Sequence, residues 1–279
     1  AICLIAGAMG LSGCDRSEPP QDYASPQVVT FSPALTSMML ALGLEDHLVG
    51  VDRYSDLPGN IQRPIVGDTL NIRSEPILAV RPDIILSQVD VAGFEPILRI
   101  DPHIRVEYVR IESLADVSAA VELLGKLMGK TDVARQKQLQ FEAALKDVRK
   151  RCAALPTKRV LFVLGYRDPS SVGGGTFVGQ LIESAGGVNI MAEEFELWKQ
   201  PTLERIMVLK PEVVICQVNA AEAGAAKAYW HELFSNDVSV YVVTDDRWTI
   251  PGLHVAAFAD ELAEMIHGCL LYTSDAADE

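Results

Sequence analysis

Cysteine is scarce in this chain, and the few cysteines present build none of the usual cysteine-based frameworks. Among its 279 residues are five cysteines, of which Cys152 and Cys216 fall in the part expected to fold. Two cysteines so far apart make no metal-binding motif and only a weak case for a disulfide. Cys216 ends a predicted buried strand and Cys152 lies near the end of a predicted long helix, so both are expected to be small apolar core residues.

The chain also lacks a basic surplus, long apolar runs and clustered histidines. The formal net charge of -14 argues against a nucleic-acid partner, because the phosphates would be repelled. No apolar run reaches the ~18 residues expected of a membrane-spanning helix. The five histidines are scattered, without a His-x-His pair or a histidine-rich loop, which argues against a bare zinc or manganese site.

Complete catalytic motifs are missing as well. Gly173, Gly174 and Gly175 precede a predicted helix and could cradle a phosphate, but neither the Walker lysine nor the full dinucleotide fingerprint accompanies them. A tight strand-to-helix turn also explains the three glycines. Ser32 precedes Pro33 without the Gly-x-Ser-x-Gly elbow of hydrolases. The sequence therefore predicts a protein that is not an enzyme.

What the chain does contain is an internal echo. Residues 75–86 and 204–215 match without a gap, and each copy reads as a short helix, a basic residue plus proline, and an apolar β-branched run. Proline lacks a backbone donor and biases the residue before it away from the helical region, so each helix is expected to end there. The apolar run is typical of a strand covered on both faces. The echo indicates two similar α/β lobes with a cleft between them; the alternative is two unrelated units that share common residue types.

The two ends of the sequence carry signals of a different kind. Residues 1–14 read as the second half of a secretory signal closed by a lipobox, in which Cys14 would be lipidated; the alternative is a short buried helix with a chance cysteine. Residues 15–26 are polar and read as a flexible tether. A diacylated cysteine would anchor the protein to a membrane without spanning it. Residues 269–279 resemble read-through of a sequencing-library adapter and are expected to add nothing to the fold.

Between the ends, the pattern predicts two lobes and one long helix. Residues 27–112 read as an α/β lobe, residues 113–156 as a helical connection, and residues 157–268 as a second α/β lobe with the same plan. Residues 131–155 contain no glycine or proline, and Pro156 ends this stretch. At ~1.5 Å per residue it predicts a rod of roughly 36 Å, enough to join two lobes. The predicted fold is α/β, with two Rossmann-like lobes joined by one long rigid α-helix.

Several segments in the same order carry a family resemblance. They are residues 29–36, 54–58, both copies of the echo, 173–187 and 198–204. Together they resemble the cobalamin and ferric-siderophore binding proteins of ABC importers, from about Val28 to His267. The resemblance implies the class III periplasmic binding protein fold, in which one rigid helix links two lobes.

The same resemblance implies a function and a location. It implies a substrate-binding lipoprotein that captures a metal chelate (cobalamin, a ferric siderophore or haem) between its lobes and delivers it to an ABC permease and its ATPase. The protein would be secreted across the inner membrane and held in the periplasm or at the cell surface by a lipid anchor on Cys14. We expect a monomer with no cofactor of its own.

Two glutamates are the predicted contacts with the permease. In this family one glutamate on each lobe docks into arginine pockets of the permease, and Glu75 and Glu204 stand at the matching positions, at the same place in both copies of the echo. A local explanation also exists, because a carboxylate in a first helical turn is favoured by the helix dipole by ~0.3–1 kcal/mol. The shared position favours docking.

Two aromatic residues are predicted to contact the ligand. The resemblance aligns Tyr54 with a tyrosine that contacts cobalamin in its binders, and it places Trp248 in a loop that closes over the ligand. Aromatic faces suit a flat macrocycle. Where cobalamin binders carry further aromatic residues, this chain has Thr69, Leu164 and Ser170.

Charged residues complete the predicted ligand site. Four arginines in or near the cleft loops would suit carboxylate-bearing siderophores or haem propionates, although each could equally be a solvated surface residue. The charged set is Arg53, Arg73, Arg167, Arg247 and Asp246. Two other functions stay open at this point: a zinc- or manganese-binding importer component with a related fold and, less favoured, an α/β enzyme.

Overall fold

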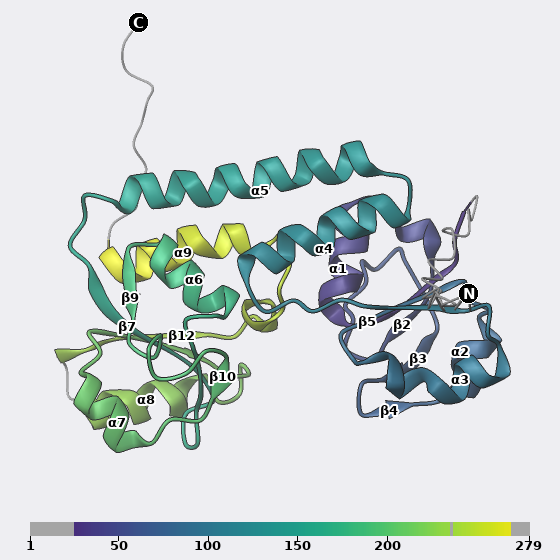
Figure 1. Cartoon of the computed structure of the whole chain (residues 1–279). Helices are drawn as coiled ribbons and strands as arrows, with labels where there is room; N and C mark the ends of the chain where they lie inside the picture. The colour runs from purple at the N-terminus through teal and green to yellow at the C-terminus, as the bar shows by residue number, and fades with distance from the viewer. Residues whose placement is uncertain (1–24, 235–236, 269–279) are drawn as a thin grey trace, which may run out of the picture.

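The computed structural model describes residues 25–234 and 237–268. The predicted signal with Cys14, nearly all of the predicted tether and the tail at 269–279 lie outside these residues. Two lobes, each with its own sheet, lie under the two ends of the long helix α5 (Thr131–Cys152), as Figure 1 shows. The predicted α/β fold with two sheet-containing lobes is confirmed.

The N-terminal lobe is built on a sheet of order β4-β3-β2-β1-β5-β6. Its pairings are parallel except for the β3–β4 hairpin. Strand β1 is buried along its whole length because it has strands on both edges and helices on both faces. The elements are β1 (Val28–Phe31), α1 (Pro33–Ala41), β2 (Leu48–Asp52), β3 (Ile65–Asp68), β4 (Asn71–Ile72), α2 (Ser74–Ala79), β5 (Ile84–Ser87), α3 (Glu95–Ile100) and β6 (Arg105–Tyr108).

The C-terminal lobe repeats the central part of this plan. Its sheet has the order β10-β8-β7-β11-β12, with β9 pairing β7. Strands β7, β11 and β12 are parallel, and β8 and β10 add antiparallel edges. The elements are β7 (Lys158–Leu164), β8 (Ser170–Val172), α6 (Phe177–Ser184), β9 (Gly187–Asn189), β10 (Trp198–Lys199), α7 (Leu203–Leu209), β11 (Val213–Gln217), α8 (Ala223–Phe234), β12 (Ser239–Val243) and α9 (Val255–His267).

Both copies of the echo form the predicted helix and strand. Helix α2 leads into β5, and helix α7 leads into β11. The basic residue before each proline adopts the left-handed conformation, with φ of 49° at Arg81 and 46° at Lys210. No other described non-glycine residue has a positive φ. Both copies of the echo therefore leave their helices by the same uncommon turn, and the proline that follows disfavours another right-handed helical residue before it.

The helical connection consists of α4 (Leu114–Leu127) and α5. Ser113 and Asp116 form the capping box that starts α4. Helix α5 begins at Thr131, the predicted start, with Lys130 as its N-cap and no side-chain cap, but its last residue is Cys152. The chain turns after Cys152, whose carbonyl accepts from the Leu155 amide at 3.0 Å, so the helix stops three residues before the predicted end.

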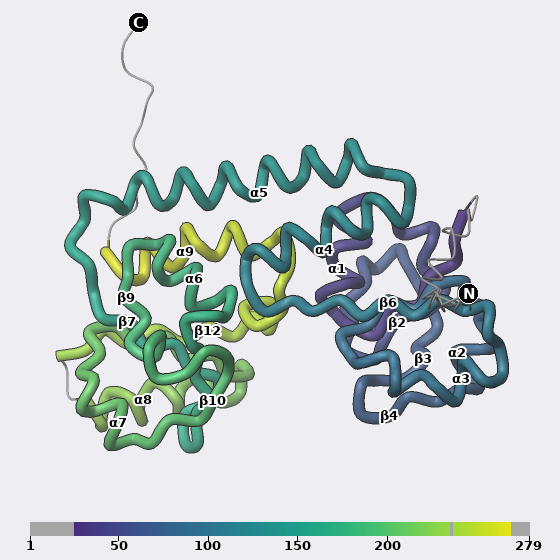
Figure 2. Tube along the Cα trace, in the orientation of Figure 1, coloured from purple at the N-terminus to yellow at the C-terminus, as the bar shows by residue number. Residues whose placement is uncertain are grey.

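A layer of helices shared by both lobes holds the molecule together. One apolar cluster combines α1, α4, α5, α6 and α9 with the upper faces of both sheets. The other face of each sheet packs against helices of its own lobe, α2 and α3 in one and α7 and α8 in the other. Figure 2 shows α5 crossing above α4 and α9. Because one continuous core spans the joint, the lobes are connected by buried apolar surface as well as by the chain.

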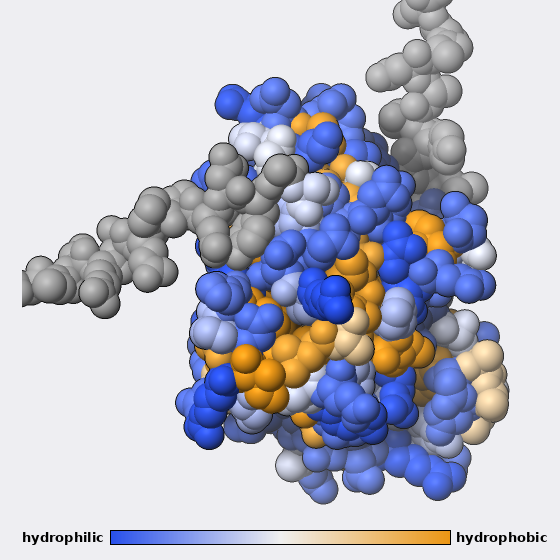
Figure 3. Space-filling view, turned by 90° about the vertical axis from the view of Figure 1, so that its right-hand side faces the viewer, coloured by the Kyte–Doolittle hydropathy of each residue, from blue (hydrophilic) through white to orange (hydrophobic). Residues whose placement is uncertain are grey.

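The surface of the N-terminal lobe carries several exposed apolar side chains. Figure 3 looks onto this end of the molecule and shows a band of apolar residues among the hydrophilic ones. Large apolar side chains exposed in this lobe include Ile65, Leu70 and Ile100. In the described part of the chain, no helix is both long and apolar enough to cross a membrane.

Candidate functional site

The predicted ligand residues lie in loops at the C-terminal ends of parallel strands. The loops at 52–58, 164–169 and 244–250 lie at the ends of β2, β7 and β12, each of which pairs in parallel with at least one neighbouring strand. This is the edge at which open α/β sheets bind ligands. We call these three segments the facing loops.

Two observations indicate that the lobes approach each other near these loops. A Cβ placed on Gly252 of the C-terminal lobe would lie 3.7 Å from Oγ of Ser37 on α1. The hydrogen bond from Arg247 to Asp245 raises the pKa of Arg247 above its ordinary value, and the charges of Glu261 and of Asp56, from the other lobe, add to the shift. The loop after β2 is therefore close to the loop after β12.

Tyr54 is the most open aromatic side chain of the facing loops. It is 64% exposed, and its backbone N–H donates to Oδ2 of Asp52 at 3.2 Å. Asp52 ends β2 and is 1% exposed, so the loop is tied to a buried carboxyl group while the ring projects outward. This arrangement leaves the ring free to cover an apolar or aromatic ligand.

Trp248 lies in a buried aromatic environment. It is 2% exposed and stacks on Phe258, with ring centroids 4.4 Å apart and an interplanar angle of 10°. Its centroid is 6.3 Å from that of Phe162, also in a stacked arrangement. The aromatic neighbours come from α9 and β7 and are not revealed by the local sequence. Ligand contact at Trp248 stays a prediction.

The arginines nearest to Tyr54 and Trp248 already have carboxylate partners. Arg53 Nε lies 3.6 Å from Asp68 Oδ2. Arg247 donates through Nε to both carboxylate oxygens of Asp245 at 3.0 Å and through Nη2 to Oδ2 at 2.6 Å. This guanidinium also lowers the pKa of Asp245. An anionic ligand would compete with these aspartates for the same donors.

The remaining charged residues of the predicted set are spread out. Arg167 is exposed and lies over the ring of Tyr166, 5.6 Å from its centroid. Asp246 is exposed in the short turn beside Arg247. Arg73 is the N-cap residue of α2 and is exposed close to Glu75 rather than within the facing loops.

Carboxylates outnumber guanidinium groups in the facing loops. Apart from the buried Asp52, the acidic residues are Asp56, Asp168, Asp245 and Asp246, and the basic ones are Arg53, Arg167 and Arg247. Because two of the three arginines are paired internally, the field that a ligand meets here is acidic.

Two glutamines at this edge were missed by the sequence analysis. Gln217 ends β11, is 2% exposed and donates through Nε2 to the Asp245 carbonyl at 3.4 Å, while its Oε1 has no partner among the described residues. Gln88 follows β5 and accepts a hydrogen bond from the Ser32 hydroxyl. Both stand thirteen positions after the glutamate that opens their copy of the echo, so extending the comparison past the strands would have found them.

The two predicted docking glutamates are equivalent in the structure. Glu75 lies in the first turn of α2 and Glu204 in the first turn of α7. Both side chains are exposed, and neither forms an ion pair with another described residue. Each is therefore free to meet a partner protein.

The described residues contain no group of three or more His, Cys, Asp or Glu side chains placed to hold a metal ion. The zinc or manganese alternative thus has no donor cluster there to support it.

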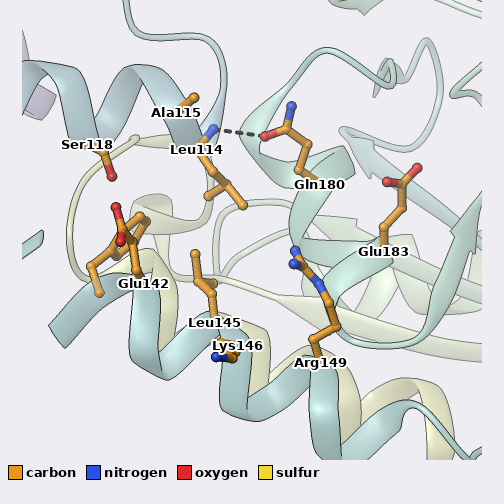
Figure 4. A pocket seen from close by; sticks show the side chains of 10 residues that line it. Leu114, Ala115, Ser118, Glu142, Leu145, Lys146, Arg149, Gln180 and Glu183 are labelled. Carbon is orange, nitrogen blue, oxygen red and sulfur yellow. Dashed lines mark hydrogen bonds between the residues drawn. The ribbon is translucent and has the colours of Figure 1, made fainter. Parts of the chain in front are cut away.

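A separate pocket of about 600 Å³ lies at the joint between the lobes, between α4, α5 and α6, as Figure 4 shows. On its wall, Gln180 Oε1 accepts from the Leu114 backbone N–H at 2.9 Å, and Arg149 donates to Ser184 at 3.0 Å. A further hydrogen bond of 2.6 Å joins the Phe177 amide to the Glu112 carbonyl. These bonds tie the connection to α6 and restrain movement between the lobes.

Known proteins of similar sequence and structure agree with this layout. The chain is 28% identical over 212 residues to a vitamin B12-binding protein of Yersinia pseudotuberculosis, an alignment that covers 74% of this chain and 75% of the relative. Among solved structures, a periplasmic haem-binding protein of Vibrio cholerae superimposes with a TM-score of 0.76 at 18% identity, covering 87% of this chain and 99% of the other.

A periplasmic vitamin B12-binding protein of the same organism superimposes with a TM-score of 0.72 at 20% identity, covering 86% and 96% of the two chains. These superpositions establish the fold. The sequence profile of the periplasmic binding protein family matches residues 28–250, most of the chain. The protein therefore belongs to the periplasmic binding protein family.

Proposed function

We propose that this protein captures a metal chelate between its facing loops and delivers it to the permease and ATPase of an ABC importer. The family assignment supports a binding protein, and relatives named for vitamin B12 and haem point to chelates. The site is formed by loops at the strand ends of both lobes. It offers one open aromatic ring, Tyr54, which suits a flat macrocycle.

Among chelates, we propose a corrinoid of the cobalamin type. The observation that carries this choice is the charge of the facing loops: their aspartates outnumber their arginines, and Arg53 and Arg247 are already paired with Asp68 and Asp245. Haem brings two propionates, which would have to displace these aspartates from their guanidinium groups. Cobalamin carries neutral amides on its rim and only one anionic group, a phosphodiester, so it needs fewer of these guanidinium groups.

Haem is the second candidate, and a specific observation supports it. The Tyr54 phenol is exposed on the loop after β2, and tyrosine is a known axial ligand of haem iron. The Arg167 guanidinium has no carboxylate partner among the described residues, so it would be available to a haem propionate.

Delivery would use the two equivalent glutamates. Glu75 and Glu204 project from the first turns of corresponding helices, one on each lobe, which suits a two-point contact with basic pockets of a permease. A lipid anchor on Cys14 would hold the protein near that permease. This anchor and the expected monomeric state rest on the sequence alone.

Direct titration tests the ligand assignment. The protein is titrated with cyanocobalamin, haemin and a ferric hydroxamate siderophore by isothermal calorimetry, and the haemin titration is also followed in the Soret band. We expect cyanocobalamin to bind with a dissociation constant near or below about 1 μM, equivalent to roughly 8 kcal/mol. Haemin binding with a tyrosinate-type spectrum and no cobalamin binding would replace the corrinoid by haem. Binding of none of the three would remove the chelate proposal.

A further inference from the structure

A chain of buried hydroxyl groups lies under the loop that carries Tyr54. Thr36 on α1 is 0% exposed, and its Oγ1 lies 2.7 Å from Thr30 Oγ1 and 2.6 Å from Ser55 Oγ. The same oxygen lies 3.1 Å from the Ser32 carbonyl. Ser55 in turn bonds to the carboxyl group of Asp52. The chain therefore links three segments: β1, α1 and the loop after β2.

The carboxyl group of Asp52 closes this chain on the Tyr54 side. One of its oxygens contacts the Ser55 hydroxyl, and the other accepts from the Tyr54 amide. Ser55 also donates its own amide to the Asp52 carbonyl at 3.3 Å. The position of the Tyr54 backbone is thus set by Asp52, and the position of Asp52 is set by Ser55 and Thr36.

Counting protons shows which form of Asp52 completes the chain. Four contacts each need one proton: Asp52 to Ser55, Ser55 to Thr36, Thr30 to Thr36, and Thr36 to the Ser32 carbonyl. The three hydroxyl groups supply three protons, so an ionised Asp52 leaves one contact unfilled. A protonated Asp52 supplies the fourth and donates to Ser55, which donates to Thr36, which donates to the carbonyl.

We propose that Asp52 is a positioning residue for ligand binding, which holds the Tyr54 loop as a protonated carboxyl group at the head of this hydroxyl chain. The inference rests on the proposed function for its link to ligand, but the state of Asp52 can be tested without one. In this proposal, Thr36 and Ser55 are the residues through which the loop that carries Tyr54 is fixed to the sheet.

The electrostatic surroundings agree with a protonated group. Burial raises the pKa of Asp52 above its ordinary value, the hydrogen bonds from Ser55 and the Tyr54 amide oppose this shift, and the charge of Asp68 on β3 adds to it. Arg53, the neighbouring cation, is drawn towards Asp68. Helix α1 and strand β1 contribute only Thr36 and Thr30 at this point, and neither is charged.

The sign of the pH dependence follows directly. An acid whose pKa is higher in the folded than in the unfolded protein binds its proton more tightly when folded. The wild type should therefore gain stability as pH falls from neutral towards the unfolded value near 3.8. Asp52→Asn offers a permanent donor to Ser55 and an acceptor to the Tyr54 amide, so it should imitate the protonated form at every pH.

The first arm of the experiment measures urea unfolding from pH 7.5 to pH 4.5 for the wild type and Asp52→Asn. We expect the variant to unfold at an equal or higher urea concentration at pH 7.5 and its advantage to shrink as pH falls. Asp101→Asn is the matched control, because Asp101 also accepts a backbone amide two residues on, from His103 at 3.1 Å, at the opposite edge of the sheet. An Asp52→Asn curve that runs parallel to the wild type, or a variant less stable at pH 7.5, would overturn protonation.

The second arm measures amide hydrogen exchange of the segment 52–56 in the ligand-free protein. Thr36→Val and Ser55→Ala remove one hydroxyl each, and we expect exchange of this segment to rise by roughly tenfold, because each lost bond favours local opening. Asp52→Asn should leave exchange unchanged. Unaltered exchange in both hydroxyl variants would overturn the positioning role, and using two variants guards against a folding defect in one of them.

The third arm titrates the same variants with cyanocobalamin. We expect Thr36→Val and Ser55→Ala to bind it about three- to tenfold more weakly, while the control Asp101→Asn binds like the wild type. Failure of the wild type to bind cyanocobalamin would remove the proposed ligand and leave the first two arms to judge Asp52. Full affinity in both hydroxyl variants would overturn the link to binding.

Discussion

The two lobes begin alike and end differently. In each, the acidic residue after the echo proline accepts a backbone amide at the start of the neighbouring strand: Asp83 from Gln27, just before β1, at 2.7 Å, and Glu212 from Arg159, near the start of β7, at 2.9 Å. Its own amide donates back to the same residue's carbonyl at 2.8 Å in both lobes. The equivalence thus extends from the sequence pattern to individual side-chain contacts at the N-terminal edge of each sheet.

At the opposite edge the lobes diverge. The N-terminal lobe presents an exposed tyrosine on a loop held by buried hydroxyl and carboxyl groups. The C-terminal lobe presents a loop locked by aromatic stacking of Trp248, with Arg247 bound to Asp245. The shared edge carries one exposed glutamate in each lobe, whereas the divergent edge carries the residues that we propose contact the ligand. The following predictions test this division.

The largest effect on function is expected at Glu75 and Glu204, the glutamates that occupy the same position in both lobes. Reversing both Glu75→Arg and Glu204→Arg should abolish uptake of labelled cyanocobalamin by cells that have this protein as their only binding protein, since like charges at a docking contact cost several kcal/mol. Affinity for cyanocobalamin should be unchanged. Each single reversal should reduce uptake to a similar extent if the lobes are equivalent.

Glu232→Arg provides the matched control, because Glu232 is an exposed glutamate on α8. It should transport normally. Normal transport by the double reversal would refute the docking role, and loss of cyanocobalamin binding would place these glutamates in the ligand site instead.

The next largest effect concerns the locked loop of the C-terminal lobe. Trp248→Ala removes a ring that is 2% exposed and stacked on Phe258 and Phe162, so we expect a loss of about 3–5 kcal/mol in the free energy of unfolding, measured in urea. Trp248→Phe keeps a ring in the stack and should lose clearly less. An alanine variant with wild-type stability that no longer binds cyanocobalamin would identify Trp248 as a direct contact.

Tyr54 should show the opposite behaviour. Tyr54→Ala should leave the free energy of unfolding within about 0.5 kcal/mol of the wild type, because the side chain is 64% exposed. Its affinity for cyanocobalamin should fall by about 2 kcal/mol, or roughly thirtyfold. Tyr54→Phe keeps the ring and should bind nearly as well. Equal losses in both variants would show that the phenol, not the ring face, makes the contact.

The contrast between the edges also explains what the sequence could predict. The echo, the end of each helix before Pro82 and Pro211, and the capping box at Ser113 depend on residues close together in the chain, and all are present. Glu75 and Glu204 were found because they occupy repeated positions. Local chemistry thus defines the shared edge.

The divergent edge depends on contacts between distant residues. Trp248 was selected because the resemblance places it in a loop over the ligand, and nothing near it in the sequence reveals its stacking on Phe162, 86 positions earlier. The arginines were predicted to pair with acidic groups of a ligand because the sequence does not show that Arg53 turns towards Asp68. Asp52 was not selected at all, since its role arises only when β1, α1 and the loop after β2 come together.

The smallest predicted effect tests the equivalence of the echo itself. Arg81 and Lys210 hold left-handed backbone conformations that cost a residue with a side chain roughly 1–2 kcal/mol. Glycine removes this cost but loses about 0.5–1 kcal/mol through its greater freedom in the unfolded chain. Arg81→Gly and Lys210→Gly should each therefore stabilise the protein by about 0.5–1 kcal/mol in urea unfolding.

The control lies two residues before Arg81. Ala79 is exposed and ends α2 in a helical conformation, so Ala79→Gly should destabilise by up to about 1 kcal/mol. Arg159 bonds to the carbonyl of Lys210, a backbone group that glycine retains, so Lys210→Gly should keep this contact. Because the two sites lie in different lobes, their gains should add in the double variant. A gain at one site and a loss at the other would mean that the two turns, although equal in backbone angle, do not carry the same strain.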